Sequence, residues 1–410
     1  MEKLNYYLQN NLLRNIAYVF SGDFFAKIVV FVTIFLLANY LPVAEFGRYN
    51  YLFSLLSLII IITDPFFNTY LRDFRYHNNR KFDIGILLIP ILLIPAFVGS
   101  IEILTEQDLN ILVVSIFSLN FILFSLAKTY LNVFEKYKKF SLVNVVQQIS
   151  ILLSSITLLF VFGIKQAEIF IEFNYLVAFI SICLLCFIIF ERSSLLFSLN
   201  IKSKLKLVRD SKYLVLYLSV IPLINFADLY FVEKYLSEEE LGYYSFSLKL
   251  FNISLVGLGP LLTVFRIQQI DKVKEGKAYD FFIRNIKKIS ILSIAFIGLM
   301  VCGTVVFINV LFPSYMSSLS SSIILFCCTG VSYMAIPFSY LMALRKYKEV
   351  FILSVIALII DISINYFLVP KYGIIAAAVS TFLAHSFLNI GNMIWSVSFI
   401  QKSNSTLKAI

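Results

Sequence analysis

Apolar runs of about 20 residues follow one another along nearly the whole sequence, separated by short polar segments. As a helix, a run of that length crosses a hydrocarbon core of roughly 30 Å. Of the 410 residues, 60% are hydrophobic and only 14% are charged, whereas soluble domains are about 25% charged. The runs are continuously apolar, unlike the alternating strands of an outer-membrane barrel. The sequence therefore predicts an all-α integral membrane protein with many spans.

Twelve transmembrane helices are expected, at residues 15–38, 46–70, 84–104, 109–134, 141–163, 168–190, 213–235, 241–266, 289–312, 320–344, 349–369 and 373–400. If the N-terminus lies in the cytoplasm, 27 of the 34 Lys and Arg residues fall in inner segments. Only four fall in outer loops: Arg48, Lys165, Lys234 and Lys371. Because cytoplasmic loops carry an excess of Lys and Arg, both termini are predicted to be cytoplasmic. Topology and attraction to anionic lipid head groups then explain the net charge of +10, and nucleic-acid binding is not expected.

Two stretches of the chain are similar to each other. Residues 40–49 (YLPVAEFGRY) align with residues 235–244 (YLSEEELGYY), and the same offset of 195 carries Pro65 onto Pro260. Proline removes a backbone hydrogen bond from a helix, and membrane helices tolerate such kinks. Pro65 and Pro260 are therefore either tolerated kinks or, as a matched pair, hinges for a conformational change.

A second set of matches, at an offset of 210, extends this repeat. Residues 130–138 align with residues 340–348, and residues 162–164 with residues 372–374. Each repeat holds six predicted helices, and an even number returns the chain to the same side of the membrane. The halves are therefore expected to be parallel repeats. The predicted domains are an N-terminal lobe (1–195), a cytoplasmic amphipathic linker (196–212) and a C-terminal lobe (213–410).

Ionisable residues inside the predicted spans are functional candidates, because a charge at the bilayer centre costs at least about 2.5–3.5 kcal/mol on insertion scales. Lys27 and Asp361 lie near the midplane and must face protein or a watery cavity. Asp23 lies one turn before Lys27 on the same helix face, where the two can pair. The other acids and cations at membrane depth are Asp64, Asp228 and Lys249, and three cations near the cytoplasmic boundary can extend to the interface instead: Arg72, Lys128 and Arg266.

Asp361 is the acid best placed to couple transport to an ion. Asn365 follows it by one helical turn and offers a second oxygen atom. Such a pair can bind and release a proton or Na⁺, and the alternative is a structural hydrogen bond between helices. No other cofactor and no metal centre is expected.

Motifs for catalysis and nucleotide binding are absent from the sequence. There is no phosphate-binding glycine loop, no nucleophile elbow and no Cys/His cluster with zinc spacing. Cys183 and Cys186 form a single CxxC inside an apolar run, where small packing residues are expected rather than a redox centre. The chain is therefore not expected to be an enzyme.

The repeated turn is the most specific motif. Residues 41–49 and 236–244 share the pattern Leu-x-x-x-Glu-[Phe/Leu]-Gly-x-Tyr. Together with the Lys-Tyr-Lys link at 346–348 and the segment VPKYGIIAAA at 369–378, this pattern resembles the polysaccharide-repeat flippases. These are Wzx-type members of the multidrug/oligosaccharidyl-lipid/polysaccharide (MOP) exporter superfamily. The resemblance covers essentially the whole chain.

The resemblance implies a V-shaped, alternating-access molecule in the bacterial inner membrane. Its two lobes would move an undecaprenyl-diphosphate-linked oligosaccharide, a repeat unit of O-antigen or capsule, from the cytoplasmic to the outer leaflet. Expected partners are this lipid-linked substrate, membrane lipids, and a polysaccharide polymerase with its chain-length regulator. The cations that would suit the diphosphate are Lys27, Arg72, Lys128, Lys249 and Arg266.

The four membrane acids leave a second interpretation open. A cavity lined by Asp23, Asp64, Asp228 and Asp361 would also suit a MATE-like, cation-coupled antiporter of drugs or metabolites. A membrane polymerase is a third possibility, but the predicted outer loops are too short to hold exported sugars.

Overall fold

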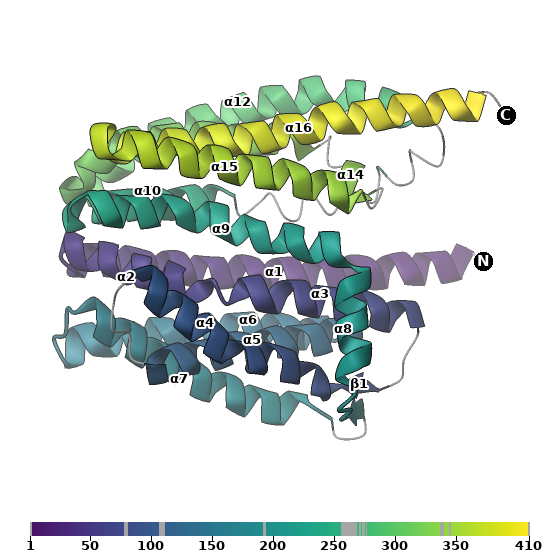
Figure 1. Cartoon of the computed structure of the whole chain (residues 1–410), viewed down its shortest axis with the longest axis horizontal. Helices are drawn as coiled ribbons and strands as arrows, with labels where there is room; N and C mark the ends of the chain where they lie inside the picture. Colours follow the sequence, from purple (N-terminus) through teal and green to yellow (C-terminus); the bar gives the residue numbers. More distant parts are fainter. Residues whose placement is uncertain are drawn as a thin grey trace. The chain divides into compact units, whose positions relative to one another are not determined.

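The computed structural model of the chain describes residues 2–77, 81–105, 111–191, 194–255, 277–336, 340–343 and 346–408, with the single residues Gln269, Lys272 and Glu275. Nearly all of these residues are helical (Figure 1).

The helices of the first half are α1 (Glu2–Tyr40), α2 (Val43–Ser57), α3 (Ile60–His77), α4 (Leu88–Thr105), α5 (Ile111–Val133), α6 (Tyr137–Ile156) and α7 (Ala167–Ile189). They are followed by α8 (Ile201–Asp210), α9 (Lys212–Tyr235), α10 (Glu238–Ser254), α12 (Ala278–Leu311), α13 (Leu319–Met334), α14 (Tyr340–Ala343), α15 (Tyr347–Tyr372) and α16 (Ile374–Lys408). Short helical turns lie at η1 (Ile84–Leu87), η2 (Thr157–Val161) and η4 (Pro313–Ser318). Two short strands, β1 (Phe82–Asp83) and β2 (Leu195–Leu196), pair in parallel with Phe82 opposite Leu195.

Within the described ranges, nine helices are long and apolar enough to cross a membrane. Three expected spans are not among the nine. Span 46–70 is divided between α2 and α3, span 84–104 is a shorter apolar helix (Ile84–Ser100), and span 241–266 is described only as far as Leu255. An all-helical membrane protein is thus confirmed, and the number twelve stays a prediction.

The chain forms two compact units. The first comprises Met1–Leu41 and Leu52–Ser219, and the second comprises Pro42–Tyr51 and Val220–Ile410. In the first unit, α1 packs along α6, and α5 packs against α3 and α7. In the second unit, α16 packs along α15 and α13, and α13 also contacts α10 and α12. The first turns of α2 therefore belong with the C-terminal helices, although α1 and α3 belong to the other unit.

Two glycines of the repeated turn let α2 approach α10 closely inside the second unit. A Cβ atom on Gly47 would lie 2.5 Å from the backbone nitrogen of Gly242, and one on Gly242 would collide with the carbonyl oxygen of Val43. Small residues allow such backbone contact between membrane helices. Phe46 is fully buried beside this contact, and its ring centre lies 5.7 Å from the ring centre of Tyr315. The glycine that repeats in the sequence is thus a packing residue in both copies.

The expected single helix over residues 46–70 is wrong. It breaks at Leu58 and Ile59, whose amides bond three residues back instead of four. Pro65 lies inside α3, and the break precedes it. The carbonyl of Ile61, which Pro65 cannot bond, accepts a hydrogen bond from Ser219 Oγ at 3.1 Å. Because this contact satisfies the carbonyl, α3 continues through the proline.

The later matches of the repeat have the same backbone geometry. Lys136 and Lys346 precede α6 and α15 with φ,ψ values of −83°, 56° and −83°, 57°. Gly163 and Gly373 both have positive φ, 65° and 62°, a conformation that favours glycine. The sequence repeat is therefore also a repeat of local structure at these turns.

Candidate functional site

Two acids predicted to lie at membrane depth meet inside the second unit. Asp228 comes from α9 and Asp361 from α15, and both side chains are 0% exposed. Their carboxyl groups interact electrostatically with each other. Two interacting buried carboxyl groups cannot both be charged without a proton or cation between them.

Polar side chains of α15 and α16 surround the acid pair. Asn365 Nδ2 donates to Asp228 Oδ1 at 2.7 Å and to Ser380 Oγ at 3.0 Å. Ser380 Oγ donates to Asp361 Oδ1 at 2.7 Å, and the Thr381 hydroxyl donates to Asp228 Oδ2. All five side chains are buried. The network thus fixes both carboxyl groups from two neighbouring helices.

Three members of this cluster were not predicted from the sequence: Ser380, Thr381 and Tyr244. The Tyr244 hydroxyl on α10 lies 3.2 Å from Thr381 Oγ1. Serine and threonine are common in membrane helices and carry no signal by themselves. The sequence feature that indicates close packing here is the run of alanines 376–378. These alanines are buried, and their small side chains let α16 approach its neighbours closely.

Two oxygen atoms in the cluster are buried without a hydrogen-bond donor among the described residues: Asp361 Oδ2 and Asn365 Oδ1. Leaving such atoms unsatisfied is costly. The described ion pairs do not include Asp228 or Asp361. Carboxylate, amide and hydroxyl oxygens together suit a proton or a small hard cation. We call these residues (Asp228, Tyr244, Asp361, Asn365, Ser380, Thr381) the acid cluster.

A second polar site lies in the first unit, where α1 packs on α6. Asn144 Nδ2 donates to Asp23 Oδ1 at 2.5 Å. Gly22 permits this approach, because a Cβ atom there would collide with Ser141. Lys27, one turn further along α1, is exposed and interacts electrostatically with Asp23. Asp23 therefore has a partner from another helix that was not predicted.

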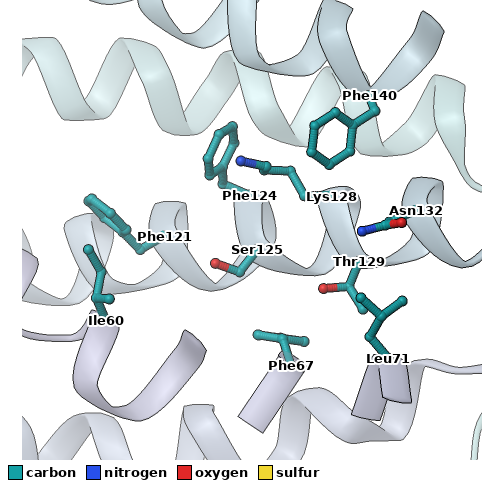
Figure 2. Close-up of a pocket in the computed structure, with 10 residues that line it drawn as sticks. All are labelled: Ile60, Phe67, Leu71, Phe121, Phe124, Ser125, Lys128, Thr129, Asn132 and Phe140. Carbon is teal, nitrogen blue, oxygen red and sulfur yellow. The ribbon is translucent and has the colours of Figure 1, made fainter. Parts of the chain in front are cut away.

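Lys128 lies in a cavity of about 310 Å³ in the first unit (Figure 2). Its Nζ atom lies 5.0 Å from the ring centres of both Phe124 and Phe140, a distance at which a cation is attracted to an aromatic face. Ser125 and Thr129 lie on the same helix, α5, and face Phe67 and Leu71 of α3 across the cavity (Figure 2).

The other predicted site residues are less informative. Lys249 lies in α10 and is half-buried. The Pro65 ring is buried in α3. The side chains of Asp64 and Arg72, and the whole of Pro260 and Arg266, lie outside the described residues.

Comparisons with known proteins identify a family and a fold. The sequence profile of a family described as "Polysaccharide biosynthesis protein" matches residues 12–265. A search among curated proteins finds no match.

Several solved structures share the fold over most of their length. A structure of the lipid II flippase MurJ in an inward closed conformation has a TM-score of 0.67 and 15% identity, covering 92% of this chain and 87% of that one. A MOP superfamily transporter from Pyrococcus furiosus has a TM-score of 0.62 and 11% identity, covering 95% and 96%. An outward-facing multidrug resistance MATE transporter of the same superfamily matches with a TM-score of 0.62, 11% identity and the same coverage. At these identities the likeness shows the fold alone.

Proposed function

Because the chain belongs to the polysaccharide biosynthesis protein family, we propose that it is a flippase for a lipid-linked oligosaccharide. Its substrate is an undecaprenyl-diphosphate-linked repeat unit of O-antigen or capsule, moved from the cytoplasmic to the outer leaflet of the bacterial inner membrane. The family match carries the proposal, since it covers residues 12–265 and names polysaccharide synthesis. The MOP transporter fold supports it, because the lipid II flippase MurJ shares that fold.

In this proposal two six-helix lobes, residues 1–195 and 213–410, alternately open a central cavity on either side of the membrane. Residues 196–212 join the lobes on the cytoplasmic face, and both termini are cytoplasmic. Pro65 and Pro260 serve as hinges. The substrate diphosphate is held by the membrane cations Lys27, Arg72, Lys128, Lys249 and Arg266. A polysaccharide polymerase and its chain-length regulator receive the translocated unit.

The acid cluster is the proposed ion-coupling site. A proton or Na⁺ bound by Asp228 and Asp361 would neutralise the pair and satisfy Asp361 Oδ2 and Asn365 Oδ1. Loss of that ion leaves buried negative charge, which disfavours the packing of α9 against α15 and α16. Ion occupancy would therefore bias one conformation of the second unit over another. In the first unit, the residues proposed for ion coupling or charge pairing are Asp23 and Asp64.

Reconstituted vesicles test the proposal. Purified protein should accelerate movement of undecaprenyl-diphosphate-linked oligosaccharide between leaflets, measured by access of an impermeant sugar oxidant to the head group. Protein-free vesicles give the background rate. Transport at background rate, with folded protein present, would reject the flippase function.

A drug antiporter is the second candidate, favoured by the acid cluster and by the fold shared with a multidrug resistance transporter. The same vesicles distinguish the two. A cationic dye that exchanges for protons or Na⁺, with no movement of the lipid-linked sugar, would support the antiporter.

A further inference from the structure

The segment between α7 and α9 has a defined orientation in the first unit. α8 runs crosswise to the longer helices of that unit and contacts α3 (Figure 1). Membrane-spanning helices lie along one direction, so a short helix crosswise to them takes the orientation of a helix in the membrane interface. The sequence of α8, IKSKLKLVRD, is rich in cations and leucine or valine.

One lysine of α8 fixes the helix to the protein. Lys204 is only 5% exposed. Its Nζ atom lies 3.2 Å from Asp83 Oδ2 and donates to the carbonyl of Ser198. Asp83 Oδ1 also accepts from the amides of Gly85 and Ser198, at 2.9 and 3.0 Å. A charge-assisted hydrogen-bond network of this kind holds α8 in one rotation about its axis.

The opposite side of α8 carries three exposed cations. Lys202, Lys206 and Arg209 are exposed, and their spacing of four and three residues places them in one stripe. Lys204 lies about 200° around the helix from both Lys202 and Lys206, at roughly 100° per residue. The burial of Lys204 therefore determines that the stripe faces away from the protein.

Large apolar side chains are exposed on α8 and in the segment just before it. Phe197, Leu199 and Leu205 are 58%, 69% and 52% exposed. Apolar side chains of this size next to Lys and Arg are typical of a surface that inserts among lipid head groups. The acid of α8 is Asp210. Its Oδ1 atom lies 3.8 Å from Arg209 Nε and partly offsets the positive charge of that arginine.

We propose that α8 and residues 196–199 form a binding surface for the anionic phospholipids of the cytoplasmic leaflet. Phe197, Leu199 and Leu205 enter the acyl boundary, and Lys202, Lys206 and Arg209 contact lipid phosphates. The Asp83–Lys204 pair transmits this contact to β1 and the start of α4. The proposal is independent of which substrate the protein moves.

Nanodiscs of defined lipid test the charged part of the surface. Replacing about a third of phosphatidylcholine by phosphatidylglycerol should raise the melting temperature of the wild type by about 5 °C, because a lipid that binds only the folded state stabilises it. The triple variant Lys202→Gln/Lys206→Gln/Arg209→Gln should lose most of that gain. A matched control, Lys138→Gln/Lys139→Gln/Lys348→Gln, removes three exposed cations elsewhere and should keep the gain. An equal response of wild type and triple variant, or an equal loss in the control, would overturn the proposal.

Two further measurements address the source of the phosphate and the apolar part. Millimolar inorganic phosphate in phosphatidylcholine nanodiscs should not raise the melting temperature; if it does, the cations form a site for free phosphate and the surface proposal fails.

Phe197→Trp in a Trp395→Phe background places a single indole on the surface, since the chain has one tryptophan. Lipids brominated high on the acyl chain should quench it at least twofold, and Lys204→Gln should reduce the quenching. Absence of quenching in folded protein would show that residue 197 does not enter the membrane.

Discussion

Asp361 is the residue whose role can be tested most directly. Its Oδ1 atom accepts a hydrogen bond from Ser380 Oγ, and its Oδ2 atom has no hydrogen-bond donor among the described residues. We expect Asp361→Asn to fold, because the amide has nearly the same shape and adds a donor. It should slow sugar-lipid translocation by about tenfold or more, within the usual range of coupling between sites. It should also remove any acceleration by an imposed proton or Na⁺ gradient.

Vesicle translocation with and without each gradient measures this effect. Asp280→Asn, at an exposed site in the first turn of α12, is the control and should behave as wild type. A gradient response in Asp361→Asn that equals the wild-type response would leave only a structural role for this carboxyl group.

Glu191 gives a pH-dependent prediction outside the membrane. A hydrogen bond of 2.5 Å from Lys136 Nζ, together with the positive charge of that lysine, lowers the pKa of Glu191 below its ordinary value. The pair therefore stabilises the fold above the ordinary carboxyl pKa of about 4.3, and this contribution is lost as the pH falls through the lowered value. Because the carboxyl is exposed, the effect is small.

We expect Glu191→Gln and Lys136→Gln to melt slightly below wild type at pH 7, by a similar amount. The difference should shrink as the pH is lowered below about 4. Melting curves from pH 7 to pH 3 in detergent check this. A difference that grows on acidification would contradict the assigned ion pair.

Sequence reasoning found single residues of the acid cluster but not their assembly. Asp228, Asp361 and Asn365 stand out because charge and amide groups are rare at membrane depth. Ser380, Thr381 and Tyr244 do not stand out, and only tertiary packing brings α9, α10, α15 and α16 together. The same holds for Asp23, whose observed hydrogen-bond partner is Asn144 on α6 rather than a residue on its own helix.

At the scale of elements, the contact between α2 and α10 is the most sensitive to substitution. A Cβ atom on Gly242 would meet backbone atoms of Val43, which cannot rotate away as a side chain can. Gly242→Ala should therefore lower the unfolding free energy by about 1–3 kcal/mol, the usual cost of overpacking. Gly303→Ala is the matched control, because a Cβ atom there meets nothing within 4 Å on α12. Thermal unfolding of both variants in the same detergent measures the difference, and equal stability would show that the helices are not in backbone contact.

Helix boundaries illustrate what hydropathy can and cannot predict. The cores of the long spans were found, since about 20 apolar residues have few alternatives to a membrane helix. The division of span 46–70 into α2 and α3 was missed, because the break falls at Leu58 and Ile59 in an uninterrupted apolar run. The sequence instead indicates a kink at Pro65. There α3 continues, because Ser219 Oγ donates to the Ile61 carbonyl that Pro65 cannot bond. A contact distant in sequence thus decided the local geometry.

At the scale of the whole molecule, the repeat found in the sequence is matched by equal turn geometry before α6 and α15 and by positive φ at Gly163 and Gly373. Six helices in each repeat would make the halves parallel, so equivalent loops would lie on the same side of the membrane. Inverted repeats would place them on opposite sides. Four exposed lysines lie in or next to two such pairs of connections, at the ends of the neighbouring helices: Lys138 with Lys348, and Lys165 with Lys371.

Cysteine substitution at these four positions tests both the repeat and the orientation in whole cells. The native cysteines lie in predicted spans and would be replaced by serine first, so that each variant carries one thiol. We expect Lys165→Cys and Lys371→Cys to react with a membrane-impermeant maleimide added outside. Lys138→Cys and Lys348→Cys should react only after the membrane is permeabilised, because their loops belong to the cytoplasmic segments that hold most Lys and Arg. Opposite labelling within either pair would exclude parallel repeats. If each pair agrees but the sides are exchanged, the repeat stands, the termini are outside, and the depth assigned to Lys27 and Asp361 must be measured from the other face.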